Sequence, residues 1–139
     1  MRIMPPQPEK FLWQRTHVRA NCHTAQAGVR ILNTMLHTRT CSSHPTLLTT
    51  EEAHALLEDL SGWALSTTGG SIIRTFNLAD YYQTLALVNA IAYIAHQQNH
   101  HPELLVSYNK VVVTYNTHDV GGLSINDFIC AARINTLIS

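Results

Sequence analysis

The stretch that decides the fold spans residues 99–122 and reads NHHPELLVSYNKVVVTYNTHDVGG. Its two β-prone segments, Leu104 to Tyr108 and Lys110 to Thr117, stand on either side of Asn109, and the second contains three valines in succession. We expect these segments to pair as an antiparallel hairpin that turns about Asn109. Gly121-Gly122 then ends the second strand and begins the connection to the next element.

Helix and strand signals extend the pattern on both sides of this hairpin. Each predicted helix begins at a capping residue, and an upstream hairpin turns at the Thr-Thr-Gly-Gly of residues 67–70. The alternation of single helices with pairs of strands predicts an α+β domain, in which three helices pack on one face of a four-stranded antiparallel sheet. In chain order the elements are a helix from Thr49 to Ser61-Gly62, strands over Trp63 to Ser66 and Ile72 to Phe76, a helix after Asp80, the hairpin, and a helix after Ser124.

The helix that begins after Asp80 has an unusually wide apolar surface. So broad a surface predicts burial on more than one side of the helix. One face is marked by Tyr82, Leu85, Ala86, Asn89, Ala92 and Ala95, and this face is widened by Leu87, Val88, Ile91 and Ile94.

The 139 residues of the chain suit one domain with a single hydrophobic core. Residues 1–45 lack clear caps and sustained apolar periodicity, so we interpret them as a flexible N-terminal extension and residues 46–139 as the whole functional unit. We expect a cytoplasmic protein. Organellar import is the alternative, because the extension is rich in Arg and poor in acids, although its opening prolines spoil an amphipathic helix.

Charge and hydropathy exclude two classes of function. Residues 46–139 hold only Arg74, Lys110 and Arg133 against eight carboxylates, so the domain lacks the basic surface that direct nucleic-acid binding needs. No apolar run approaches the roughly 20 residues that cross a bilayer, so no membrane association is expected. The three cysteines, Cys22, Cys41 and Cys130, are an odd and sparse set, which predicts free thiols in a reducing compartment.

Three histidines converge in the predicted hairpin. With the turn centred as above, the numbers of facing residues sum to about 218, which places His100 near His118 and His101 near Thr117. Asp127 lies in the first turn of the final helix, where its carboxylate can orient and charge a histidine ring. Spacing alone leaves an exposed turn and a zinc site as alternatives. Zinc is disfavoured, because adjacent side chains of an extended segment point in opposite directions and do not easily share one ion.

A second group of metal-binding residue types lies near the N-terminus. It consists of Cys22-His23 and His37 with Cys41. The group lacks the short Cys-x-x-Cys spacing of common zinc fingers, so we interpret it as incidental composition.

Several short motifs are spread over the elements of the domain. They are Asn-His-His-Pro at 99–102, Tyr-Asn-Lys at 108–110, Thr117-His118, Gly122-Leu123 and Asp127, preceded by Gly62-Trp63, the strand at 74–76 and the helix at 80–98. Together they resemble the signature of the pterin-4a-carbinolamine dehydratases over about residues 47–137. The chain departs from the pattern of this family at two positions: Asn99 stands where an Asp is common, and His96 stands where some members have an acid. These differences concern the tuning of pKa values and the fit of the substrate, and they leave the three histidines in place.

The resemblance implies the activity and its context. The expected enzyme is a hydro-lyase that converts 4a-hydroxytetrahydropterin to quinonoid dihydropterin and water by histidine acid/base catalysis, with no cofactor and no metal. We expect a homodimer or homotetramer that serves tetrahydrobiopterin recycling beside phenylalanine hydroxylase and a dihydropteridine reductase. Because some family members also act as dimerisation cofactors of a homeodomain transcription factor, a protein-interaction role is the alternative.

The resemblance also implies a role for each residue of the site. Two histidines of this chain match the acid/base positions of the family, and a third matches a substrate-binding position. An aspartate of the chain matches the signature aspartate and is expected to orient a histidine ring. These residues are the catalytic His100 and His118, the substrate-binding Asn99, His101, Asn116, Thr117 and Asp119, and the orienting Asp127.

Overall fold

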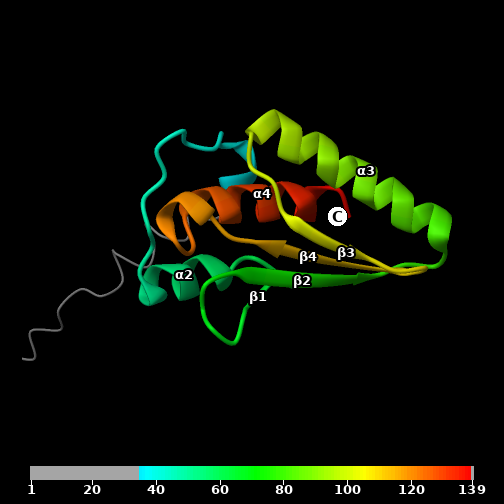
Figure 1. The fold of residues 1–139 in the computed structure, drawn as a ribbon, viewed down its shortest axis with the longest axis horizontal. Helices are drawn as coiled ribbons and strands as arrows, with labels where there is room; N and C mark the ends of the chain where they lie inside the picture. Colours follow the sequence, from blue (N-terminus) through cyan, green and yellow to red (C-terminus); the bar gives the residue numbers. More distant parts are fainter. Residues whose placement is uncertain (1–34, 139) are drawn as a thin grey trace, which may run out of the picture.

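Four antiparallel strands form one sheet in the computed structural model, which describes residues 35–138 (Figure 1). The strand order is β1-β2-β4-β3, so the two hairpins adjoin through β2 and β4. Helices and strands alternate as predicted, and the α+β fold is confirmed. The strands are β1 (Ala64–Leu65), β2 (Ile72–Asn77), β3 (Glu103–Val106) and β4 (Lys110–Tyr115); the helices are α2 (Thr50–Leu57), α3 (Tyr81–Gln98) and α4 (Ile125–Thr136), with short 3-10 turns η1 (Leu36–Thr38) and η2 (His118–Val120).

Local capping chemistry determines where the helices begin. The Thr49 hydroxyl accepts a hydrogen bond from the Glu52 amide at 3.2 Å, and the Glu52 carboxylate accepts one from the Thr49 amide at 2.9 Å. This reciprocal pair is the capping box predicted for α2. Asp80 caps α3 through its side chain, also as predicted. The end of α2 differs from the prediction, because the helix stops at Leu57 and Leu60 belongs to a following turn.

One face of the sheet carries the hydrophobic core. Alternate side chains of β2 and β4 point to this face, because Ile72 pairs with Tyr115 and Phe76 pairs with Val111. In Figure 1, α3 and α4 lie over the same face of the sheet. All three helices contribute to this single core, through Ala53 and Leu56 of α2, Leu87, Ile91 and Ile94 of α3, and Phe128, Ile129 and Ile134 of α4.

The C-terminal hairpin forms as predicted, but its register is shifted by one residue. Val106 pairs with Val111, one position from the predicted alignment. The shift arises because Tyr108 and Asn109 together form the turn, so the axis of the hairpin lies between them and not on Asn109.

The ladder of this hairpin also ends before the histidines. Glu103 is the first residue of β3 that pairs with β4, and the chain leaves the sheet on the N-terminal side of this residue. The predicted cross-strand pairing of His100 with His118, and that of His101 with Thr117, is therefore wrong. His100 turns toward α4 instead.

The buried face of α3 is not the face that the sequence marked first. Thr84, Leu87, Ile91, Ile94, Ala95 and Gln98 are buried against the domain. Tyr82 and Leu85, which begin the predicted stripe, are exposed, and Tyr82 is 84% exposed. The helix thus carries more apolar surface than its own domain covers.

Residues 36–44 pack along α4, and we call this segment the N-terminal strap. Leu36 is completely buried, and the Arg133 guanidinium donates a hydrogen bond to the Arg39 carbonyl at 2.7 Å. The Ser42 amide donates to the Asn126 side chain at 2.8 Å, and that side chain donates back to the Ser42 carbonyl at 2.9 Å. The strap is therefore packed, in contrast to the flexible extension predicted over residues 1–45. Residues 1–34 of that extension lie outside the described residues.

Replacing Leu36 with Ala should lower the free energy of unfolding by about 2 to 5 kcal/mol, the usual cost of truncating a fully buried leucine. Leu36 belongs to the core cluster and has no exposed surface. Urea unfolding followed by tryptophan fluorescence measures the loss. The matched control is Leu47→Ala, because Leu47 is 58% exposed. Equal stability of the two variants would contradict the packing of the strap.

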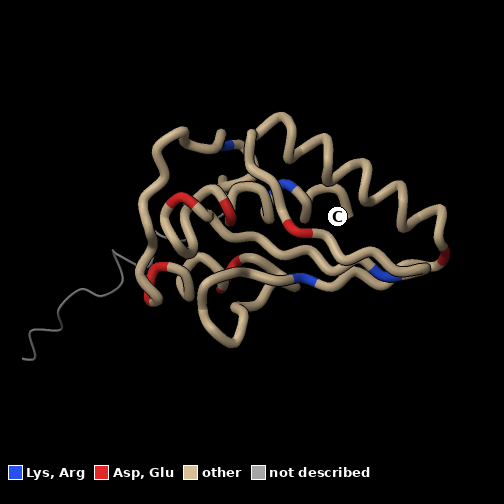
Figure 2. The backbone as a smooth tube through the Cα atoms, in the orientation of Figure 1, with Lys and Arg blue, Asp and Glu red and all other residues tan. Residues whose placement is uncertain are grey.

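Charged side chains are few and dispersed over the described residues (Figure 2). Their Lys and Arg are Arg39, Arg74, Lys110 and Arg133, which stand on separate segments. Arg74 packs over the Phe76 ring, with its guanidinium carbon 4.5 Å from the ring centroid. Within this part of the chain, no helix is long and apolar enough to cross a bilayer.

Candidate active site

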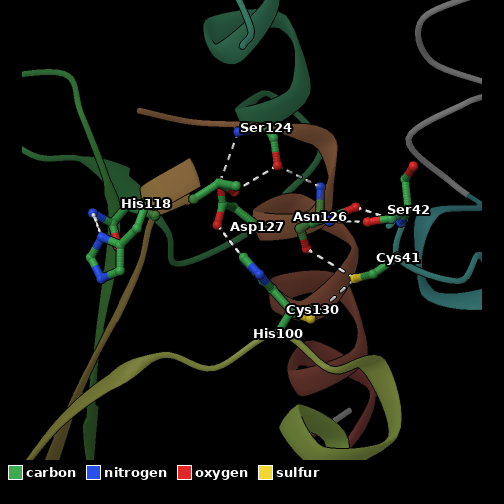
Figure 3. Close-up of polar contacts among 10 residues, drawn as sticks. Cys41, Ser42, His100, His118, Ser124, Asn126, Asp127 and Cys130 are labelled. Atoms are coloured by element: carbon green, nitrogen blue, oxygen red, sulfur yellow. Dashed lines mark hydrogen bonds and ion pairs between the residues drawn. The ribbon is translucent and has the colours of Figure 1, made fainter. Parts of the chain in front are cut away.

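His100 and Asp127 form a hydrogen-bonded pair between the end of α3 and the first turn of α4 (Figure 3). Nε2 of His100 lies 2.6 Å from Oδ1 of Asp127. The His100 side chain is 12% exposed, and the Asp127 side chain is fully buried. A buried carboxylate needs partners for its charge, and a protonated imidazole supplies one. The sequence predicted a contact between Asp127 and a histidine ring, and this ring is His100.

Two further donors hold the second oxygen of the Asp127 carboxylate. Oδ2 accepts hydrogen bonds from the Ser124 amide at 2.8 Å and from the Thr117 hydroxyl at 2.9 Å. The hydroxyls of Thr117 and Ser124 lie 2.6 Å apart, and both residues are buried. Asp127 is also the third residue of α4, where its carboxylate completes the capping box that begins at Ser124. The same carboxylate therefore starts the helix and orients His100.

A reversal of the chain after α3 brings His100 to this position. Asn99 ends the helix in the left-handed conformation, with φ 48° and ψ 41°, which Asn tolerates better than most residues. The His100 amide donates to the Ala95 carbonyl at 3.1 Å. The His100 ring then stacks on Tyr115, with centroids 5.5 Å apart and planes 13° from parallel. Backbone and ring contacts together fix the imidazole.

Burial and the neighbouring carboxylate act in opposite directions on the pKa of His100. Burial disfavours the charged ring and lowers the pKa. The hydrogen bond and the negative charge of Asp127, helped by Cys41, favour the charged ring and outweigh burial, so the pKa of His100 is raised. The protonated ring therefore persists to higher pH than in a free histidine.

A cleft of about 200 Å³ adjoins this pair. His118 lies in η2 at the surface, and its Nδ1 is 3.3 Å from Nδ2 of Asn116. His101 is also exposed. The structure thus brings the predicted catalytic and substrate-binding residues together around one cleft, with Asp127 behind His100. The lining residues are Asn99, His100, His101, Asn116, Thr117, His118 and Asp119.

A second cavity, of about 190 Å³, lies between the start of α2 and two glycine turns, at Gly69-Gly70 and Gly121-Gly122. Apolar residues, threonines and glycines line it, so it offers no titratable side chain. The histidine cleft is the stronger candidate, because acid/base chemistry needs such groups. Within residues 35–138, no three His, Cys, Asp or Glu side chains gather as a metal site. Cys22 and His23, which belong to the N-terminal group of metal-binding residue types, lie outside that range.

Sequence reasoning missed two residues near the site. Tyr115 is completely buried and stacks on His100. The sequence did carry a signal for Tyr115: it lies two positions before Thr117, so in an extended segment both side chains point to the same side, and both are buried. Cys41 influences the pKa of His100 from the N-terminal strap. No signal pointed to Cys41, because the strap has no apolar periodicity.

A family model described as pterin 4 alpha carbinolamine dehydratase matches residues 46–137. The match includes every residue that lines the histidine cleft and the whole of α4. Because it spans well over half of the chain, the chain belongs to the pterin 4 alpha carbinolamine dehydratase family.

Individual relatives agree with this assignment. A protein of Xanthomonas campestris pv. campestris (strain 8004), named "Putative pterin-4-alpha-carbinolamine dehydratase", is 61% identical over 82 residues, or 59% of this chain and 70% of the relative. A protein of the same name from Stenotrophomonas maltophilia (strain K279a) is 56% identical over 82 residues, or 59% of this chain and 71% of the relative. A crystal structure of a "transcriptional coactivator/pterin dehydratase" from Brucella melitensis aligns with a TM-score of 0.64 and 30% identity, and the alignment covers 66% of this chain and 98% of that one.

Proposed function

We propose that the chain is a hydro-lyase that removes water from a 4a-hydroxytetrahydropterin by histidine acid/base catalysis. Membership of the family supports pterin carbinolamine dehydratase activity. The observation that carries the histidine mechanism is the buried pair of His100 and Asp127 beside a cleft that His118 also lines. Two imidazoles at one small cleft meet the need for an acid and a base near neutral pH.

The reaction requires two proton transfers. One proton goes to the 4a-hydroxyl, which leaves as water when the C4a–O bond breaks. The other leaves N5, whose electrons form the C4a=N5 double bond of the quinonoid dihydropterin. Because Asp127 holds Nε2 of His100, Nδ1 is the ring nitrogen through which His100 exchanges a proton with the substrate. The raised pKa of His100 suits it to donate to the leaving hydroxyl, and His118 then accepts the N5 proton.

The remaining cleft residues bind and orient the pterin in this proposal. Asn99, His101, Asn116 and Asp119 line the cleft and offer polar side chains to a flat heterocycle. Thr117 differs from them, because it is 5% exposed and its hydroxyl donates to Asp127. We therefore propose that Thr117 supports the carboxylate more than it contacts the substrate.

The proposed chemistry is proton transfer alone, so the enzyme needs no redox cofactor and no metal. Its substrate arises when a pterin-dependent hydroxylase, such as phenylalanine hydroxylase, leaves a hydroxyl on C4a of its cofactor. The product is reduced by a dihydropteridine reductase, which places the enzyme in tetrahydrobiopterin recycling. This context and a cytoplasmic location are carried by the resemblance to the family.

The decisive experiment supplies the purified chain with freshly generated 4a-hydroxytetrahydropterin. We expect its ultraviolet spectrum to convert to that of the quinonoid dihydropterin faster than in buffer alone, and at an unchanged rate after treatment with a chelator. A rate equal to the uncatalysed one would refute the proposed activity. A rate that falls on chelation and returns with zinc would refute the metal-free mechanism.

Replacing His101 with Ala should raise KM about tenfold while changing kcat little, because a group that positions the pterin acts equally in the ground state and the transition state. Its exposed side chain at the rim of the cleft is the basis for this role. Steady-state kinetics separates the two constants. An unchanged KM with a large loss of kcat would instead place His101 among the proton-transfer groups.

We also propose that the chain assembles as a homodimer or homotetramer. The uncovered apolar side chains of α3 support this, since Tyr82 is 84% and Tyr93 is 64% exposed. Light scattering coupled to size-exclusion chromatography should give two or four times the 15.5 kDa of one chain. A monomer at all concentrations would contradict the proposal.

A further inference from the structure

A pair of thiols joins the N-terminal strap to α4. Sγ of Cys41 lies 3.7 Å from Sγ of Cys130, although the two residues are 89 positions apart in the sequence. Both thiols are free; Cys41 is partly exposed and Cys130 is completely buried. The proposed dehydration uses neither of them.

Several contacts hold Cys41 in this position. Its amide donates a hydrogen bond to Oε1 of Gln98 at 3.0 Å, and its thiol lies 3.7 Å from the Asn126 carbonyl oxygen. The neighbouring Ser42 is bound to the Asn126 side chain in both directions. Cys41 is thus tied to both α3 and α4. A reaction between prepositioned groups of this kind is favoured over the same reaction between separate molecules.

We propose that Cys41 and Cys130 form a reversible oxidation site, at which a low-molecular-weight disulfide such as oxidised glutathione converts the two thiols into an intramolecular disulfide. The Cys41 thiolate attacks one sulfur of the oxidant, which forms a mixed disulfide and releases one small thiolate. Cys130 then loses its proton, attacks the Cys41 sulfur and displaces the second small thiol. Two electrons pass from the protein to the oxidant, which becomes two small thiols.

The surroundings of the two sulfurs divide the roles between them. The hydrogen bond from the Cys130 thiol lowers the pKa of Cys41 against the opposing effect of burial, and the nearby charges of His100 and Arg133 lower it further. The pKa of Cys130 is raised, because its thiol donates to Cys41 and is buried. Cys41, which is also the more exposed, is therefore the attacking thiol, and Cys130 is the resolving thiol.

Formation of the bond requires only a local movement. The sulfurs must approach from 3.7 Å to about 2.05 Å, and Cys41 lies in a segment outside regular secondary structure. The resulting cross-link fastens the strap to α4 beside the His100 and Asp127 pair (Figure 3). The inference does not depend on the dehydratase reaction. It concerns the extension of this chain, because Cys41 precedes the residues 46–137 that match the family.

The test exposes the full chain to glutathione buffers with graded proportions of the oxidised form. After acid quenching and alkylation, we expect two thiols to become unreactive together and a peptide pair linked through Cys41 and Cys130 to appear in mass spectrometry. Dithiothreitol should reverse the change. Cys22→Ser is the matched control and should oxidise as the wild type does. Thiols that stay reactive at every ratio, or a linkage that involves Cys22, would overturn the proposal.

Two variants separate the steps of the reaction. Cys130→Ser should accumulate glutathione on Cys41, because no resolving thiol remains. Cys41→Ser should give no cross-link and leave Cys130 reduced. Because Cys41 is partly exposed, this variant still tests the proposal if Cys130→Ser, which changes a buried residue, fails to fold. Glutathione that persists on Cys41 of the wild type without a cross-link would show that the pair does not resolve, and would reject the intramolecular disulfide.

Discussion

Replacing both His100 and His118 with Ala should lower the rate of dehydration by at least about 10²- to 10⁴-fold, the range that positioned acid/base groups contribute. The double variant keeps the pterin-binding residues of the cleft but has neither imidazole for proton transfer. Single-turnover dehydration of each stereoisomer of the 4a-hydroxytetrahydropterin measures the effect on the chemical step. Steady-state rates are less informative here, because they include product release.

The single variants should differ from the double variant in kind. C4a carries its hydroxyl on either face, so in this proposal His100 donates to the hydroxyl of one stereoisomer, and the two histidines exchange their acid and base roles for the other. We therefore expect His100→Ala and His118→Ala each to retain partial turnover of a mixed substrate. His100→Ala should also destabilise the fold, because this ring is 12% exposed and bound to Asp127, whereas His118 is at the surface.

Thermal unfolding of each variant distinguishes lost chemistry from lost structure. The matched control is His54→Ala, since His54 is an exposed histidine of α2 that does not line the cleft. This variant should react at the wild-type rate. Near-wild-type rates in the folded double variant would remove His100 and His118 from the mechanism.

The parts of the fold that the sequence predicted correctly are those set by neighbouring residues. Thr49 and Asp80 cap their helices through side-chain contacts three residues away, so the signal and its effect lie in the same short segment. The β4 strand was predicted for a similar reason, because Val111 and Val113 favour extended backbone and face the core. Local chemistry of this kind needs no knowledge of distant contacts.

The errors arose where distant contacts decide the outcome. The register of the last hairpin depends on how Tyr108 and Asn109 share the turn, and a difference of one residue displaced the predicted histidine pairs. The packing of the N-terminal strap depends on Leu36 and on hydrogen bonds to Asn126, 84 positions from its partner Ser42. Neither feature produces a periodic pattern in the sequence.

The residues that line the candidate cleft were predicted better than the geometry that brings them together. Motif resemblance identified the residues that line the cleft, and the structure gathers them, but not across the hairpin. His100 reaches the site through the left-handed Asn99 and its contact with Asp127. Asp127 is therefore the residue that connects the start of α4 to the proposed chemistry, and its replacement should affect both.

Replacing Asp127 with Asn should lower the free energy of unfolding by about 1 to 3 kcal/mol, because one of the buried hydrogen bonds loses its acceptor. Both carboxylate oxygens accept in the wild type, whereas an amide has one oxygen and one NH₂ group. If the oxygen keeps the Thr117 and Ser124 donors, the NH₂ group faces Nε2 of His100. His100 must then be neutral and accept a hydrogen bond at Nε2. It lacks the proton that it donates to the leaving hydroxyl, so kcat should fall by up to about 10²- to 10⁴-fold, the range that a positioned proton-transfer group contributes.

The pH dependence of this loss has a definite sign. The pKa of His100 is raised in the folded state by Asp127, so the ion pair stabilises the fold fully below the unfolded pKa of about 6.5 and ceases to do so as pH rises through the folded pKa. The difference in unfolding free energy between wild type and Asp127→Asn should therefore shrink as pH rises through the raised pKa that His100 has in the folded protein. Titration of the His100 ring by NMR should give a lower pKa in the variant.

The matched control is Glu58→Gln, which removes one negative charge from an exposed residue at the end of α2. This variant should keep the wild-type pKa of His100, because Glu58 is exposed and the charges that act on His100 are those of Asp127 and Cys41. Asp127→Glu should keep the cap of α4, as Glu52 does for α2, but its longer side chain displaces the carboxylate from Nε2 of His100, so we expect only partial rescue of the raised pKa. An Asp127→Asn variant that retains the raised pKa of His100 would show that another group charges the ring, and the role of the carboxylate would then be confined to starting α4.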